Sequence, residues 1–209
     1  GNGIRCVGKF LYDHGMVDIN EKDEITIETL SGIKKLKAYT SGGKVNRLRV
    51  DMGKAILEPK EIPVVLDGDK VVDRPVEIAG KNYNITCVSM GNPHCVVFMD
   101  DIDNLDIETV GPEFENDKLF PERVNTEFVT VLDDHTIKMR VWERGSGETW
   151  ACGTGACAVA VAACENGFCK KGEDIKIKLK GGDLIINYTD ETVYMTGNAE
   201  KVFEGEVEV

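Results

Sequence analysis

The densest group of chemically competent side chains in this sequence lies between residues 142 and 158. Cys152 stands directly before a Gly-x-Gly turn, and the alanine-rich residues 155–166 that follow predict a buried helix. Unpaired backbone N–H groups and the helix dipole favour an anion at such a position, which lowers the pKa of a thiol. The same N–H groups, from Gly153 and Thr154, suit a carboxylate. A thiolate beside a carboxylate-binding turn indicates proton abstraction from the carbon next to that carboxylate.

Other chemistries fit this stretch less well. A phosphate-binding loop would need a Gly-Lys-Ser/Thr sequence, which is absent, and Ser146 is not in the Gly-x-Ser-x-Gly elbow of a serine hydrolase. The cysteines at 152, 157, 164 and 169 fall on different faces of a helix, so they cannot share a metal ion. We therefore expect no metal site. Taken alone, Cys152 is also compatible with a small buried residue at a tight turn.

Composition excludes several partners. The chain has 209 residues, with 25 Lys and Arg against 37 Asp and Glu, and a net charge of −12. This charge argues against nucleic acid and against an anionic membrane surface. No apolar run approaches the roughly 18 residues of a transmembrane helix. Seven cysteines without a Cys-x-x-Cys pair indicate a reducing, cytoplasmic compartment.

The chain begins with a predicted helix over residues 3–13 that ends at Gly15. Alternating apolar residues predict strands at 24–30, 33–39, 45–51, 81–90, 95–99, 128–132, 136–142, 174–180, 183–188 and 192–196. The acidic residues 100–117 are expected to form a surface helix with loops and a solvated face.

An internal repeat relates the two ends of the chain. Gly1-Asn2-Gly3 matches Gly153-Thr154-Gly155 at an offset of 152, and Gly15 and Ile25 match Gly167 and Ile177 at the same offset. Chance similarity between two glycine-rich helix starts is the alternative. The repeat predicts an α/β (α+β) fold of two pseudo-symmetric domains, each a mostly antiparallel sheet around a central helix. It also predicts a counterpart of Cys152 one residue before Gly1.

Five motifs resemble those of the diaminopimelate epimerase family, in that family's order and over essentially the whole chain. They are Gly1-Asn2-Gly3-Ile4-Arg5-Cys6, Gly91-Asn92-Pro93-His94, Arg123-Val124-Asn125-Thr126-Glu127, Glu143-Arg144-Gly145-Ser146-Gly147-Glu148-Thr149 and Ala151-Cys152-Gly153-Thr154-Gly155-Ala156. The resemblance implies an N-terminal domain remainder at 1–53, a C-terminal domain at 54–197, and a terminal strand at 198–209 that returns to the first domain.

The resemblance also implies an activity. It is that of a cofactor-independent amino-acid epimerase, an isomerase that interconverts LL- and meso-diaminopimelate in lysine and peptidoglycan-precursor synthesis. In this family one cysteine thiolate removes the α-proton and a second thiol protonates the opposite face, in a cleft between the two domains. The first of these cysteines, with an N-terminal segment, is expected before Gly1. The family resemblance further implies a homodimer.

The family pattern assigns roles to individual residues. The catalytic residues are expected to be Cys152, His94 and Glu143. The substrate-binding residues are expected to be Gly1, Asn2, Asn92, Asn125, Glu143, Arg144, Gly153 and Thr154. Arg144 could pair bidentately with a carboxylate, and Glu143 could hold an ammonium group.

Outside the family pattern, these residues have ordinary interpretations. Asn92-Pro93 is a common turn, and Glu143-Arg144 is a common solvated pair. Two other functions stay open: a proline racemase-like or other isomerase of the same fold, and a diamino-acid-binding module without catalysis. Cys6 is expected to have no catalytic role.

Overall fold

The computed structural model describes residues 2–19, 23–29 and 32–207, and these form two compact units. Unit 1 comprises Gly1–Asp51 and Thr196–Val209, and unit 2 comprises Met52–Met195. Among the described residues, no helix is long and apolar enough to cross a membrane.

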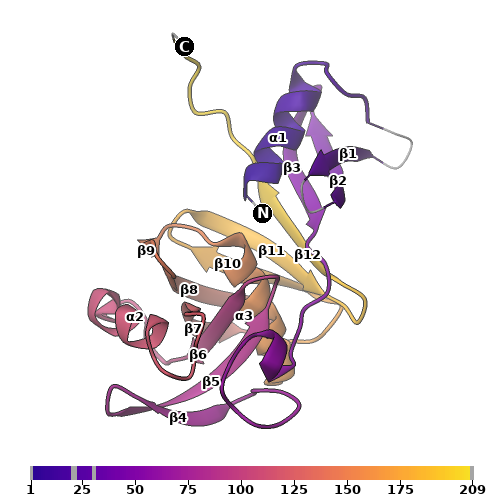
Figure 1. The fold of residues 1–209 in the computed structure, drawn as a ribbon. Coiled ribbons are helices and arrows are strands. Elements are labelled where there is room, and N and C mark those ends of the chain that lie inside the picture. The colour runs from indigo at the N-terminus through magenta and orange to yellow at the C-terminus, as the bar shows by residue number, and fades with distance from the viewer. Residues whose placement is uncertain (1, 20–22, 30–31, 208–209) are drawn as a thin grey trace. The chain divides into compact units, whose positions relative to one another are not determined.

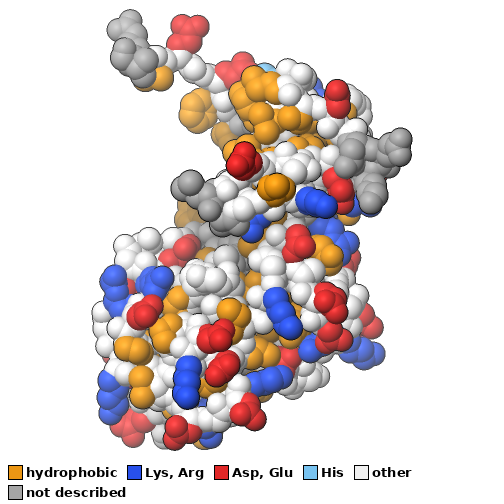
Figure 2. Space-filling view, turned by 45° about the vertical axis from the view of Figure 1, so that its right-hand side comes forward, with side chains coloured by type: hydrophobic (Ala, Val, Ile, Leu, Met, Phe, Trp, Pro, Cys, Tyr) orange, Lys and Arg blue, Asp and Glu red, His pale blue; other side chains and the backbone are white. Residues whose placement is uncertain are grey.

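The described residues of unit 1 form one helix and a short antiparallel sheet (Figure 1). Its elements are α1 (Asn2–Asp13), β1 (Glu24–Thr29), β2 (Gly32–Ser41) and β3 (Lys44–Asp51). Helix α1 packs on β2 and β3 through Gly8, where a Cβ would lie 2.8 Å from a methyl carbon of Leu48. On its other side α1 exposes Val7 and Phe10, and Figure 2 shows hydrophobic side chains gathered on the surface of this unit.

Unit 2 surrounds a second helix, α3 (Gly153–Glu165). Its other elements, in chain order, are η1 (Pro59–Glu61), β4 (Arg74–Ile78), β5 (Lys81–Ser89), β6 (Pro93–Phe98), α2 (Ile107–Glu115), β7 (Asn125–Asp133), β8 (Thr136–Glu143), β9 (Gly147–Thr149), β10 (Asp174–Leu179), β11 (Gly182–Tyr188) and the first half of β12 (Val193–Asn198). Helix α3 packs against β5, β6, β7, β10 and β11, and its residues from Ala156 to Ala163 are completely buried. Small side chains let the strands approach this helix on several sides, which confirms the predicted buried helix.

The strands form one mixed sheet rather than the two separate sheets that the repeat predicts. The hydrogen-bonded order is β1-β2-β3-β12-β11-β10-β8-β7-β6-β5-β4, with β9 paired to β8. The pairs β6–β7 and β8–β10 are parallel, and the other registered pairs are antiparallel. The order is continuous because β12 crosses the boundary of the units at Thr196 and is the neighbour of both β3 and β11.

The two copies of the repeat have the same local structure. Helices α1 and α3 are both followed by a glycine with positive φ, Gly15 at +66° and Gly167 at +79°. Each is then followed by an antiparallel hairpin, β1–β2 or β10–β11. Only glycine adopts this left-handed conformation without strain, so both glycines end their helices as predicted.

Three expectations need correction. Strands β4 and β9 are not predicted by the pattern, and β7 begins at Asn125 rather than at residue 128. Residues 100–117 are not a solvated face throughout, because α2 buries Ile107, Phe114 and Glu115. The predicted strand 24–30 is present as β1 over Glu24–Thr29, and residue 30 lies outside the described residues.

Candidate active site

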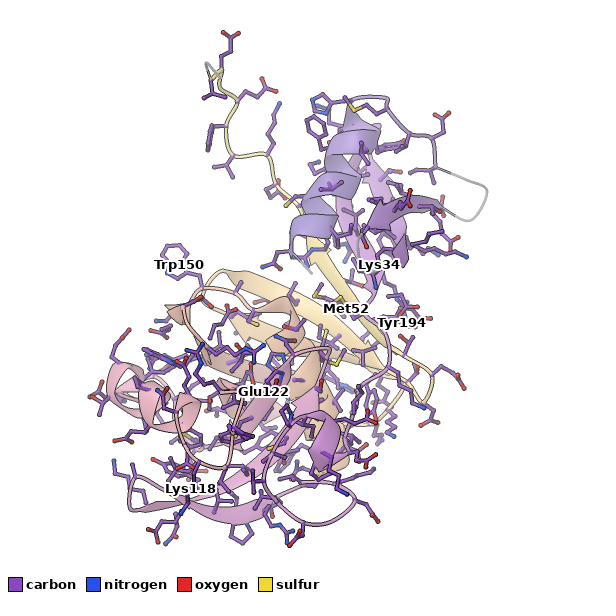
Figure 3. All side chains as sticks on the ribbon, viewed as in Figure 1. Lys34, Met52, Lys118, Glu122, Trp150 and Tyr194 are labelled. Atoms are coloured by element: carbon purple, nitrogen blue, oxygen red, sulfur yellow. The ribbon has the colours of Figure 1, made fainter. Side chains whose placement is uncertain are left out.

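Cys152 is the N-cap of helix α3. Its Sγ accepts a hydrogen bond from the backbone N–H of Gly155 at 3.3 Å and lies 3.5 Å from Oγ1 of Thr154. The side chain is only 5% exposed. The backbone that leads into α3 is held at Trp150, whose carbonyl accepts a hydrogen bond from the N–H of Gly181 at 2.8 Å. The ring of Trp150 projects from the surface of unit 2 (Figure 3). The predicted placement of a thiol at a helix N-terminus is therefore present.

The predicted low pKa of this thiol is wrong for the structure described. Burial, with the negative charges of Glu127 and Glu143, raises the pKa of Cys152 to about 12. The hydrogen bonds from Thr154 and Gly155 act in the opposite direction but do not offset this. The reason is that removing a thiolate from water opposes ionisation more strongly than a few amide dipoles favour it. At neutral pH Cys152 is a protonated thiol.

A chain of hydrogen bonds leads from Thr154 into the interior of unit 2. Oγ1 of Thr154 accepts from Nδ2 of Asn92 at 3.4 Å, and Oδ1 of Asn92 contacts Nε2 of His94 at 3.1 Å. The other ring nitrogen of His94 lies 2.7 Å from Oε1 of Glu127. Positive φ at Gly91, +91°, makes the tight turn that presents Asn92. The motif at 91–94 is thereby linked to the helix mouth at 152–154.

Asn125 joins two of the predicted site segments. Its Oδ1 accepts from the backbone N–H of Arg144 at 3.0 Å, and its Nδ2 donates to the carbonyl of Pro93 at 2.9 Å. The parallel register of β6 and β7, which pairs His94 with Asn125, makes these contacts possible. Asn125 is 3% exposed, so its amide positions the segments around it.

Glu143 and Arg144 have separate partners. The carboxylate of Glu143 accepts from the hydroxyl of Thr149, and Nη1 of Arg144 donates to the backbone carbonyl of Glu122 at 2.9 Å. Both side chains are half-buried, so neither is the solvated pair that the dipeptide alone suggests. The guanidinium of Arg144 has further N–H groups than the one engaged at Glu122.

Two buried carboxylates near the site were not assigned a role by the sequence. Glu115 of α2 accepts from the N–H of Gly145 at 2.9 Å, from Nε1 of Trp142 at 2.7 Å and from Nη1 of Arg123 at 3.1 Å. It therefore holds the turn that carries Arg144. The sequence gave no indication that Glu115 is buried, because it lies within the acidic residues 100–117, which were expected to be solvated.

Glu127, the second of these carboxylates, is completely buried. The sequence did carry a signal for Glu127, because it is an acidic residue next to the apolar run of a predicted strand. A buried acidic residue almost always has a partner, so a search for that partner would have been justified. Burial raises its pKa, while His94 acts in the opposite direction.

The remaining predicted residues lie at the two helix starts. Gly153 and Thr154 form the first turn of α3, and Asn2 begins α1, where its Oδ1 accepts from Nη2 of Arg5 at 3.2 Å. Gly1 lies outside the described residues. Hydrogen bonds thus join Cys152, Thr154, Asn92 and His94 in one group.

Comparison with known proteins gives consistent matches over the whole chain. The family model described as diaminopimelate epimerase matches residues 86–202. A diaminopimelate epimerase of Agathobacter rectalis is 51% identical over 218 residues, covering 100% of this chain and 75% of the relative. That of Acetivibrio thermocellus is 52% identical over 211 residues, covering 100% of this chain and 74% of the relative.

Solved structures with a similar fold are more distant in sequence. A probable proline racemase from Agrobacterium radiobacter has a TM-score of 0.75 at 16% identity, covering 100% of this chain and 67% of that one. A phenazine biosynthesis protein of the PhzF family from Bacillus anthracis has a TM-score of 0.61 at 16% identity, covering 95% of this chain and 73% of that one. At these identities the likeness shows the fold alone, a large mixed sheet with helices.

Proposed function

The chain belongs to the diaminopimelate epimerase family, and we propose on this premise that it interconverts LL- and meso-diaminopimelate without a cofactor. The observation that carries the proposal is the thiol of Cys152 at the N-terminus of α3, hydrogen-bonded to Thr154 and Gly155 and linked through Asn92 to His94. This arrangement supports proton transfer at a carbon beside a carboxylate, because the same helix mouth suits that carboxylate.

The reaction requires two proton carriers on opposite faces of the α-carbon. One thiolate takes the α-proton, so that a C–H bond breaks and an S–H bond forms. The second thiol gives its proton to the other face, so that its S–H bond breaks and a new C–H bond forms. The raised pKa of Cys152 keeps this thiol protonated at neutral pH, which suits the donor in this step. The opposing base in this direction is proposed to be the cysteine that the repeat and the family pattern predict before Gly1, and in the reverse direction the two cysteines exchange roles.

Other residues of the group are proposed to bind the substrate. The first N–H groups of α3, from Gly153 and Thr154, hold the α-carboxylate of the reacting centre, and Gly1 and Asn2 provide the equivalent mouth in the other domain. Arg144, with Asn92 and Asn125, serves the substrate's remaining polar groups, and Glu143 binds an ammonium group. His94 and Glu143 assist the thiols.

The site is proposed to lie in a cleft between two domains. These are residues 1–53 and 54–197, with residues 198–209 returning to the first domain. The shared helix–glycine–hairpin order of the two repeat copies supports this division. A homodimer is proposed from the family resemblance alone, and analytical ultracentrifugation tests it.

A cytoplasmic location is also proposed. The support is that all seven cysteines are free thiols. Fractionation of the source cells tests it.

Proton exchange in D₂O tests the function directly. The protein, extended at its N-terminus by the segment that carries the first cysteine, is incubated with LL-diaminopimelate, and α-proton loss and the meso isomer are followed by NMR. Deuterium incorporation with formation of the meso isomer is expected, and Cys152→Ala should abolish both. Cys6→Ser is the matched control and should retain both, since Cys6 is an exposed cysteine outside the proposed site. Binding of diaminopimelate without any exchange would contradict the epimerase and favour the binding module, and exchange with proline would favour the racemase.

A further inference from the structure

The carboxyl group of Glu127 lies directly against the first turn of helix α3. A Cβ placed on Gly155 would be 2.5 Å from Oε1 of Glu127 and 3.2 Å from Sγ of Cys152. The carboxyl group and the thiol therefore approach the same small space beside this glycine. Glu127 is completely buried, and its second oxygen, Oε2, has no hydrogen-bond partner. A buried carboxyl in this position has a direct electrostatic influence on the thiol.

Glu127 also determines where the protons of His94 lie. Nδ2 of Asn92 donates to Thr154, so Oδ1 of Asn92 faces Nε2 of His94 and accepts a hydrogen bond from its N–H. The 2.7 Å contact between Nδ1 of His94 and Oε1 of Glu127 then holds one further proton, on the nitrogen or on the oxygen. In either form the contact is neutral as a whole. Replacing the carboxyl by an amide removes the acidic group that shares this proton.

We propose that Glu127 is a positioning residue for the thiol of Cys152. Its carboxyl fixes the imidazole of His94 and, through Asn92 and Thr154, the hydrogen-bond chain that ends at the thiol. This deepens the proposed function and rests on it, because it assigns a task to a side chain that does not reach the substrate itself.

The charged and titratable groups around the thiol come from three strands. Glu127 faces Cys152 from β7, and Glu143 faces it from β8. His94 contacts Glu127 from β6, and the charge of Glu127 also contributes to the raised pKa of buried Cys95 on the same strand. With the shared proton on Nδ1 of His94, Glu127 carries a negative charge that acts more strongly on the thiol than that of Glu143. Replacing Glu127 by glutamine should therefore favour the thiolate.

Glu127→Gln tests the proposal with two measurements that do not use diaminopimelate. The chain contains three histidines, so the ¹⁵N ring signals of His94 are readily assigned. We expect the Nδ1 signal of His94 to shift in E127Q. We also expect alkylation of Cys152 by iodoacetamide at pH 8 to accelerate about tenfold, as a decrease of one pKa unit produces. Peptide mass spectrometry separates the cysteines, and exposed Cys6 is the internal reference.

Glu115→Gln is the matched control, because it converts another buried glutamate of unit 2 without touching His94. A general loosening of the unit would accelerate alkylation in both variants and leave the His94 signals of both unchanged. Unchanged His94 signals in E127Q would overturn the proposal.

A variant that does not fold still leaves a decisive measurement on the unchanged chain. The His94–Glu127 contact must give a slowly exchanging proton at low field, and its absence would overturn the proposal. A positive result without epimerisation would remove the proposed function while keeping the contact between Glu127 and His94.

Discussion

Gly155→Ala is the substitution that most directly probes the packing at the thiol. The new methyl group would lie 2.5 Å from Oε1 of Glu127, 3.1 Å from Cε of Met139 and 3.2 Å from Sγ of Cys152. The methionine can move, but the carboxyl group is held by His94 at 2.7 Å and is completely buried. We therefore expect the substitution to push Glu127 away from His94.

The size of the effect follows from opposing contributions. Alanine in place of a helical glycine stabilises by about 1 kcal/mol. Overpacking a dense core costs about 1–3 kcal/mol. Weakening a buried hydrogen bond to a charged group costs about 1.5–3 kcal/mol. Since the losses exceed the gain, the free energy of unfolding should fall by about 2–4 kcal/mol.

Urea unfolding followed by tryptophan fluorescence measures this change. Both tryptophans, Trp142 and Trp150, lie in unit 2, so the signal reports the unit that contains Gly155. The double variant Gly155→Ala with Glu127→Asp identifies the cause, because the shorter carboxylate leaves room for the methyl group. The effects of the two substitutions should be less than additive. A single variant as stable as the unchanged chain, or strictly additive effects, would refute the reasoning.

Three further outcomes are expected. Gly111→Ala places a Cβ 2.3 Å from the ring of Trp142 and should lower the free energy of unfolding by about 1–3 kcal/mol; an unchanged urea midpoint would contradict this packing. Glu115→Gln removes the charge that holds the Arg144 turn and should weaken diaminopimelate binding severalfold, as titration calorimetry would detect. The raised pKa of Cys152, about 12, means that the unfolded thiol ionises first as pH rises. Its contribution to stability is therefore full below about pH 9 and lost between about pH 9 and 12. The melting temperature should fall over this window, and less so in Cys152→Ala.

Local patterns predicted most of the secondary structure because they depend on neighbours in sequence. The small residues of 155–166 predicted a buried helix, and alternation at 174–180 and 183–188 predicted the hairpin β10–β11. Strand β9 was not predicted, because it has only three residues, Gly147–Thr149, and is defined by its pairing with β8. Strand β4 was not predicted, because its second residue, Pro75, is unusual in a strand and interrupts the alternation of apolar and polar residues.

The candidate site likewise has a part that the sequence predicted and a part that only the fold brings together. Cys152 and the turn at Gly153 and Thr154 were identified as one local motif. The link from that motif to His94 depends on Asn92, which lies 62 residues from Thr154, and no periodicity reports such a contact. The register of β6 against β7 brings the contributing segments together.

The sequence by itself determined most of the elements, the family and the thiol at a helix start, since composition and short-range spacing specify them. The tertiary structure decided the ionisation of that thiol and the partners of the buried carboxylates. The helix N-terminus alone favours a thiolate, but burial beside Glu127 and Glu143 raises the pKa of Cys152. Desolvation and charge act through space, between residues that only the fold brings together.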